Sequence, residues 1–272
     1  MVNFTTDEDP APGPFLDSVK LSNGVTLHYA SQGPATGPAV ILIHGYSDSW
    51  FSFSRILPLL PPQLRVIAPD LRGHGDSERP TSGYGIADMA DDVLRLMDVL
   101  VVPKAVLIGH SLGSFVVRKA FELAPNRVSR LVLIGGALKV DNDVARELQR
   151  AVNELTDPVD EGFVRDFQMS TIAMPVPAPF LEAVIANSRR MPARIWKAVI
   201  QGLLEFEPAV VRPDVRALVL GGREDAVFSR TEQIVLARQF PRGELQLLEG
   251  VGHSLHWEQP AMFVRALERF GV

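Results

Sequence analysis

The hydrophobic positions of this chain form short apolar runs that alternate with longer stretches of helical spacing. Six runs carry little polar alternation, which is typical of strands buried on both faces. They are 39–43, 64–68, 105–108, 131–134, 217–220 and 244–248. Apolar residues recur every three or four positions in four other stretches, which predicts helices over 86–101, 111–123, 230–239 and 260–270. This order indicates an α/β protein with a mostly parallel sheet and helices on both faces.

The first two predicted strands differ from the others in their connection. Asn23-Gly24 stands between 18–21 and 25–31, and this dipeptide favours a two-residue hairpin turn. We therefore expect the two opening strands to be antiparallel, which gives the sheet eight strands.

One long interval interrupts the alternation. Residues 138–212 contain no β-like run, and their helix-compatible stretches are separated by prolines. A structureless connection of this length is uncommon inside a compact domain. We expect a helical cap over 138–212, inserted after the sixth strand into a core formed by residues 1–137 and 213–272.

Composition and charge exclude several classes of protein and site. The 272 residues include no cysteine, which excludes disulfides and thiolate nucleophiles. A net charge of −5 gives no positive field for a phosphate backbone or an anionic membrane, so we expect neither partner. Residues 1–14 are acidic and proline-rich and lack the features of a secretory signal, and no apolar stretch of about eighteen residues follows. A soluble cytoplasmic protein is expected, and its oligomeric state stays open.

The first chemical motif is Gly109-His110-Ser111-Leu112-Gly113. It directly follows the apolar run 105–108 and opens a helical pattern. A serine in a tight turn from strand to helix needs small residues two positions before and after it. Ser111 is therefore our candidate nucleophile.

A serine hydroxyl needs a base, and the chain has six histidines. Only His253 and His256 follow Ser111 in the chain order of serine, acid and histidine that this kind of sheet uses. His253 lies on a glycine-rich loop after the last strand and is the better candidate. His256 stays as the alternative, with a structural or pocket-wall role favoured for it.

The base in turn needs a carboxylate to fix its tautomer. Glu224 and Asp225 follow the strand 217–220 on a short loop that reaches the same edge of the sheet. Asp225 is our choice, while Glu224 and Asp141 remain alternatives.

Acyl transfer also needs N–H donors for the developing oxyanion. Tyr46 follows His44-Gly45 after the strand 39–43, so its backbone N–H is one candidate. The other is the backbone N–H of Leu112, directly after the nucleophile.

Five motifs occur in order along the chain: ILIHGY (41–46), APDLRGHGDSERP (68–80), GHSLGS (109–114), GGRED (221–225) and GHSLHWEQP (252–260). With them the chain resembles the lid-bearing α/β-hydrolases of the serine esterase type, and is similar to N-acyl homoserine lactonase-like esterases. The resemblance implies Ser111 as nucleophile, Asp225 as acid and His253 as base, with oxyanion donors at Tyr46 and Leu112. Ser114 stands where relatives often have a second glycine. The polar segment 70–77 is expected to be a structural turn.

In this family the segment after the sixth strand forms a lid over the nucleophile. Here that segment is rich in large apolar side chains, of which Phe167, Met169 and Trp196 are expected to contact substrate. The expected reaction is hydrolysis of a small carboxylic ester or lactone, such as an N-acyl homoserine lactone, without a cofactor or metal. Carbon–carbon bond hydrolysis, cofactor-free perhydrolysis and a slow hydrolase-like receptor are the alternatives. Haloalkane dehalogenase and epoxide hydrolase activities are disfavoured because those enzymes need a carboxylate where Ser111 stands.

Overall fold

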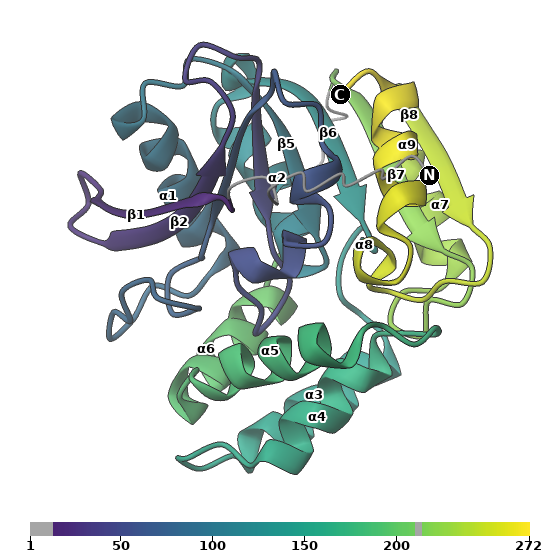
Figure 1. Ribbon diagram of the computed structural model, residues 1–272. Coiled ribbons are helices and arrows are strands. Elements are labelled where there is room, and N and C mark those ends of the chain that lie inside the picture. The colour runs from purple at the N-terminus through teal and green to yellow at the C-terminus, as the bar shows by residue number, and fades with distance from the viewer. Residues whose placement is uncertain (1–12, 210–213) are drawn as a thin grey trace, which may run out of the picture.

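An eight-stranded sheet runs through the structure, a computed structural model that describes residues 13–209 and 214–272 (Figure 1). Its strands are β1 (Phe15–Lys20), β2 (Thr26–Gln32), β3 (Ala39–Ile43), β4 (Arg65–Pro69), β5 (Ala105–His110), β6 (Val128–Ile134), β7 (Arg216–Gly222) and β8 (Arg242–Leu248). They lie in the order β1-β2-β4-β3-β5-β6-β7-β8. The β1–β2 and β2–β4 pairs are antiparallel and the other five are parallel. The predicted α/β class and eight-stranded sheet are confirmed, and the parallel strands bring their carboxyl ends to one edge.

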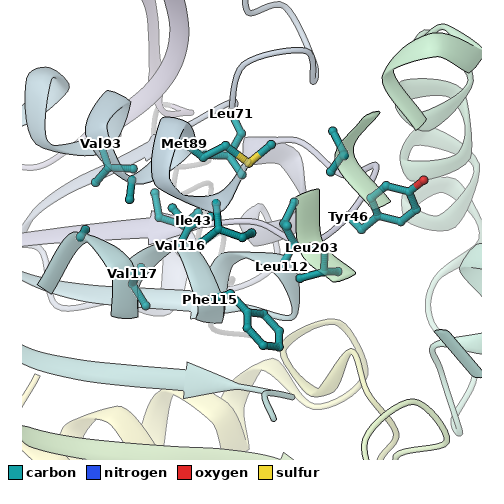
Figure 2. Close-up of a cluster of buried hydrophobic side chains, with 14 of the residues drawn as sticks. Ile43, Tyr46, Leu71, Met89, Val93, Leu112, Phe115, Val116, Val117 and Leu203 are labelled. Carbon is teal, nitrogen blue, oxygen red and sulfur yellow. The ribbon is translucent and has the colours of Figure 1, made fainter. Parts of the chain in front are cut away.

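Helices cover both faces of the sheet, as the uninterrupted apolar strands require. They are α1 (Ile86–Val99), α2 (Leu112–Leu123), α7 (Arg230–Ala237), α8 (Leu255–Glu258) and α9 (Pro260–Phe270), with short 3-10 turns η1 (Trp50–Phe53), η2 (Leu57–Leu59) and η3 (Pro125–Arg127). Ile41 and Ile43 of β3 belong to the apolar cluster that includes α1 and α2, part of which Figure 2 shows. Val40 and Leu42 belong to the opposite cluster, which includes α9.

The β1–β2 connection is longer than predicted. The Leu21 N–H donates to the Val25 carbonyl at 2.8 Å, and the Gly24 N–H donates to the Leu21 carbonyl at 2.9 Å. The loop therefore has three residues, 22–24, with Gly24 at φ +92°. A type I turn followed by a left-handed glycine also suits the twist of a hairpin, which is why Asn-Gly did not form the shorter turn.

Between β6 and β7 the described chain forms four helices and no strand. These are α3 (Asp143–Asn153), α4 (Glu161–Ser170), α5 (Ala178–Arg189) and α6 (Ala193–Leu204), which we call the helical insertion. Pro177 and Pro192 precede α5 and α6, where a missing N–H costs nothing. Figure 1 shows the four helices together at one end of the sheet, with α3 packed on α6 and α4 on α5.

Parts of the predictions fall outside the described residues. The predicted end of the cap at residue 212 is one, and most of the acidic stretch 1–14 is another. Among the helices that the structure describes, none has the length and apolar character needed to cross a bilayer.

Candidate functional site

Ser111 lies in the turn between β5 and α2 and adopts φ +49°, a rare backbone conformation for a residue other than glycine. The flanking glycines permit this turn. A Cβ on Gly109 would lie 2.1 Å from the Gly113 carbonyl oxygen, and a Cβ on Gly113 would lie 2.2 Å from the Ile43 carbonyl oxygen. The sequence thus folds locally into a strained turn that presents the Ser111 hydroxyl at the carboxyl edge of the sheet.

Ser114 occupies the position where relatives often have glycine, one turn into α2. Its side chain is fully buried, and a Cβ on Gly136 would come within 2.8 Å of its Oγ. Within the described chain this Oγ has no hydrogen-bond partner. The helix therefore accommodates the serine because the facing residue is itself a glycine.

His253 and Asp225 are in direct contact. Nδ1 of His253 lies 3.0 Å from Oδ2 and 3.1 Å from Oδ1 of Asp225. The carboxylate also accepts hydrogen bonds from the backbone N–H groups of Val227 and Phe228 at 2.8 and 3.0 Å. Burial raises the pKa of Asp225, but His253 and these N–H groups outweigh it and leave the pKa below its ordinary value. Asp225 is thus a carboxylate able to accept a hydrogen bond from the Nδ1–H of His253 and leave Nε2 as the basic nitrogen.

The alternative acids and base lie elsewhere. The Glu224 side chain is exposed, and Asp141 is exposed and paired with Arg146 at 2.8 Å. His256 is fully buried with Nε2 3.0 Å from the Ser52 hydroxyl, and burial lowers the pKa of His256 to about 3. The structure therefore brings Asp225, and neither of the other two acids, to His253.

Gly135 supports His253, a role that the sequence analysis missed. Gly135 follows β6 with φ +49°, and a Cβ there would lie 2.8 Å from Nδ1 and 2.9 Å from Cε1 of His253. The imidazole thus packs directly on the Gly135 backbone. A glycine directly after a buried strand is the only local signal that marks this position.

Ser111 and His253 both line a cavity of about 300 Å³ between the sheet edge and the helical insertion. Its walls are mainly aliphatic and aromatic, and those from the insertion are Val144, Ala145, Leu148, Phe163, Phe167, Ile200 and Leu203. Among the described residues that line the cavity there is no lysine or arginine, while Asp48 and Asp166 supply two carboxyl groups. The cavity therefore suits an uncharged, largely apolar ligand.

Neither Ser111 Oγ nor His253 Nε2 hydrogen-bonds to another group in residues 13–209 and 214–272, so no bond joins the two. Catalytic hydrogen bonds are often loose in a free enzyme and tighten when substrate binds. Both atoms are thus available to a ligand in the cavity.

The three insertion residues expected to contact substrate have different positions. Phe167 lines the cavity. Trp196 is fully buried behind it, with the ring centroids 5.6 Å apart and the indole N–H donating to the Met191 carbonyl. Met169 is 50% exposed, and neither it nor Trp196 is among the lining residues.

The two predicted oxyanion donors are backbone N–H groups without a partner in the described chain. Leu112 is the first residue of α2, where N–H groups have no intrahelical acceptor and the helix dipole favours negative charge. Tyr46 lines the cavity, and its hydroxyl donates to the Trp196 carbonyl at 2.7 Å.

Sequence reasoning also missed a buried polar group in the lining of the same cavity. Asp48 is 5% exposed, and burial raises the pKa of Asp48 to about 7 although Gln168 and Ser52 donate hydrogen bonds to it. Its Oδ2 lies 3.9 Å from Nδ1 of His110, and burial lowers the pKa of His110 well below its ordinary value. Gln168 stands four residues after Val164 on the buried side of α4, so a polar residue on an apolar helix face was the available signal.

The charged segment 70–77 forms a polar turn. Asp70 accepts hydrogen bonds from the backbone N–H groups of Trp50 and Asp76 at 2.7 and 2.9 Å. His28, Asp70 and Asp76 lie close enough to surround a cation. These hydrogen bonds and an ion pair between Asp76 and Arg190 already occupy the carboxylates. The cluster therefore has a structural role in the turn.

Comparisons with known proteins agree with this architecture. The AB hydrolase superfamily protein YfhM of Bacillus subtilis (strain 168) is 26% identical over 283 aligned positions, covering 91% of this chain and 96% of that protein. The soluble epoxide hydrolase of Corynebacterium sp. (strain C12) is 43% identical over 94 residues, which are 35% of this chain and 32% of that protein.

Solved structures match over nearly the whole chain. A hydrolase from Pseudomonas aeruginosa PA01 superposes with a TM-score of 0.84 at 25% identity, covering 94% of this chain and 98% of that one. A thermophilic esterase from Thermogutta terrifontis shares the fold with a TM-score of 0.80 at 24% identity, covering 94% and 97%. A family profile described as alpha/beta hydrolase fold matches residues 38–260. The chain therefore belongs to the alpha/beta hydrolase fold family.

Proposed function

We propose that this hydrolase cleaves uncharged carboxylic esters through an acyl-enzyme on Ser111. The observation that carries the proposal is the shared cavity: Ser111 and His253 both line it, and the Asp225 carboxylate lies 3.0 Å behind the imidazole. A serine, an imidazole and a buried carboxylate in this relation are what nucleophilic catalysis by a hydroxyl requires.

In the proposed reaction, His253 Nε2 takes the Ser111 proton as Oγ attacks the ester carbonyl carbon. The resulting oxyanion accepts hydrogen bonds from the Tyr46 and Leu112 N–H groups. The tetrahedral intermediate collapses to the acyl-enzyme, and the leaving alkoxide takes the proton from His253. Water, deprotonated by His253, then attacks the acyl-enzyme, which releases the carboxylic acid and restores Ser111.

The cavity walls favour an uncharged acyl group. Phe163, Phe167 and Leu203 present apolar surface, and the described lining offers no cation to pair with an anionic substrate. Asp166 would further repel a carboxylate. Lactones, including N-acyl homoserine lactones, fit the same proposal because ring opening begins with the same attack.

The helical insertion is proposed to act as a cap, corresponding to residues 138–212. Its support is that α3, α4 and α6 contribute the apolar walls opposite Ser111. Phe167 contacts substrate in this account. Trp196 supports Phe167 from behind, and Met169 lies at the outer surface.

An ester substrate is favoured over an epoxide although epoxide hydrolases occur among the relatives. Epoxide hydrolases of this fold need a carboxylate as the nucleophile, and this chain has Ser111 at that position. A serine ester or lactone hydrolase therefore accounts for the site better.

Hydrolysis of p-nitrophenyl butyrate by wild type, Ser111→Ala and Ser114→Ala tests the proposal. Ser114 is the matched control because it lies only three residues further along the chain, in α2, and is not among the residues that line the cavity. Turnover should be lost in Ser111→Ala and kept in Ser114→Ala, and undiminished turnover in Ser111→Ala would refute the acyl-enzyme. For substrate class, mono-p-nitrophenyl succinate should be cleaved at least about tenfold less efficiently than the butyrate because its carboxylate has no cation to meet. An acyl homoserine lactone assayed in parallel tests the lactone variant.

A further inference from the structure

Three consecutive residues of one turn hydrogen-bond to the helical insertion. This turn, 45–48, follows β3 and carries the Tyr46 N–H that the proposed function uses for the oxyanion. The Tyr46 hydroxyl donates to the Trp196 carbonyl of α6 at 2.7 Å. Ser47 and Asp48 accept hydrogen bonds from the side chain of Gln168 in α4. The turn is thus attached to the insertion at each of these positions.

Gln168 is the centre of this arrangement. It is 1% exposed, and its Nε2 lies 3.2 Å from Ser47 Oγ, 3.2 Å from Asp48 Oδ1 and 2.8 Å from Ser188 Oγ on α5. Ser188 donates its own proton to the Val184 carbonyl at 3.0 Å, so its oxygen accepts from Gln168. This fixes the amide orientation, with the nitrogen facing all three oxygens, which share its two protons.

The turn needs such support because its backbone is strained. Ser47 has φ +63°, a conformation that residues with a Cβ rarely adopt and that persists only where surrounding contacts impose it. Inside the core, Asp48 N–H donates to the Gly45 carbonyl at 3.3 Å, and Asp48 Oδ2 accepts from Ser52 at 3.4 Å. The Gly45 carbonyl also lies 2.8 Å from His44 Nδ1. The contacts from Gln168 and Trp196 add restraint to Tyr46, Ser47 and Asp48 from the side of the insertion.

Tyr46 provides the second attachment. Its ring meets Phe167 and Trp196 edge-on, with centroid separations of 5.7 and 5.0 Å. Figure 2 shows Tyr46 at the border of the core cluster, beside the helices of the insertion. The side chain of the residue that donates the proposed oxyanion N–H is therefore packed against the insertion and the cavity wall.

We propose that Gln168 is a positioning residue that holds the 45–48 turn in the geometry needed for oxyanion binding, so that the insertion supports the chemistry as well as enclosing the substrate. This inference rests on the proposed function, because it assigns a purpose to the Tyr46 N–H. It predicts that loosening the insertion from the turn weakens transition-state binding more than substrate binding.

Gln168→Met tests the inference because methionine matches the shape of glutamine and lacks its donors. Gln149→Met is the matched control, since among the described residues the Gln149 amide hydrogen-bonds only to Gln201, within the insertion. The measurements are kcat per active site titrated with a fluorophosphonate, KM for p-nitrophenyl butyrate, and the inhibition constant of a trifluoromethyl ketone with the same acyl chain. The fluorophosphonate titration counts only folded active sites. Tyr46→Phe serves as a second variant because it loses the hydrogen bond to the Trp196 carbonyl.

We expect Gln168→Met to lower kcat and ketone affinity together by about 10- to 100-fold, with KM changed little, because a misplaced donor acts mainly in the transition state. Tyr46→Phe should shift both in the same direction, and Gln149→Met should match wild type. If Ser111→Ala is inactive, wild-type kcat and ketone affinity in Gln168→Met, or a rise in KM alone, would overturn the positioning role and leave the proposed function intact. Ester turnover that persists in Ser111→Ala would instead refute the proposed function, and the role of Gln168 with it.

Discussion

Nδ1 of His253 lies 3.0 Å from Oδ2 of Asp225, and the carboxylate that makes this contact has a side chain only 1% exposed. Asp225 reaches this position from the loop after β7 and His253 from the loop after β8, which are neighbouring parallel strands. The adjacency of the two strands thus joins residues that are 28 positions apart. This pair occupies Nδ1 of His253 and leaves Nε2 as its free ring nitrogen.

Replacing Asp225 by asparagine should lower kcat by about 10³- to 10⁴-fold, because the amide no longer stabilises the imidazolium or selects its tautomer. Glu224→Gln, one residue away and exposed, should leave turnover near wild type. Steady-state ester hydrolysis measures both. The reverse ranking would identify Glu224 as the acid.

Gly135→Ala should also reduce activity strongly. A Cβ at this position would come 2.8 Å from His253 Nδ1, so the imidazole must move away from its carboxylate. Gly24→Ala is the control for left-handed backbone strain alone, since Gly24 has φ +92° and a Cβ added there would meet no atom within 4 Å. Equal kcat per folded molecule in the two variants would exclude a role for Gly135 in placing His253.

Asp48 makes the stability of the protein depend on pH. Burial raises the pKa of Asp48 to about 7, whereas the unfolded chain has the ordinary value of about 4. Between these two pH values the folded state binds more protons than the unfolded state. The contribution of Asp48 to the free energy of unfolding therefore falls as pH rises and is lowest above pH 7. Below about pH 4 both states are protonated and the contribution is constant.

Asp48→Asn stays neutral and removes this dependence. The free energy of unfolding of the variant minus that of wild type should be larger at pH 8 than at pH 5 by about 1–3 kcal/mol, because only wild type loses stability over this range. Urea unfolding of both proteins at the two pH values measures this difference. The contributions of the other titrating groups cancel because they are the same in wild type and variant. A difference that is independent of pH would show that Asp48 is ionised throughout this range.

Arg118 connects both ends of the helical insertion to α2. Its guanidinium donates to the Ala137 and Leu138 carbonyls at 2.8 and 2.9 Å and stands 5.3 Å from the Phe206 ring. Burial lowers the pKa of Arg118 to about 10, which leaves it charged at neutral pH. Arg118→Met should destabilise the protein by about 2–3 kcal/mol in urea unfolding, because two buried charge-assisted hydrogen bonds are lost. Lys119→Met on the same helix removes a partly exposed ion pair and should lower the free energy of unfolding much less. Equal losses in the two variants would contradict this role of Arg118.

The sequence predicted those features that depend on local pattern or on strand order. Short apolar runs marked β3 to β7, and the glycines around Ser111 marked the strained turn. The run 244–248 also marked β8, but this strand is not buried on both faces as expected, because it lies at the edge of the sheet with Leu245 36% exposed. Asp225 and His253 could be selected because parallel strands bring the loops at their carboxyl ends together.

Other features depend on packing that a single sequence does not encode locally. Gly135 matters through the imidazole packed on it, and Gln168 through three oxygens contributed by a turn and a second helix. The size and apolar character of Trp196 predicted a role in the insertion but not which way the side chain points, and the structure buries it behind Phe167.

Mass spectrometry after reaction with a fluorophosphonate tests the central claim most directly. The account predicts a single adduct on the peptide that contains Ser111, formed in step with the loss of ester hydrolysis and absent from Ser111→Ala. Modification of another residue in step with the loss of activity, or full hydrolysis by protein whose Ser111 is completely modified, would contradict it.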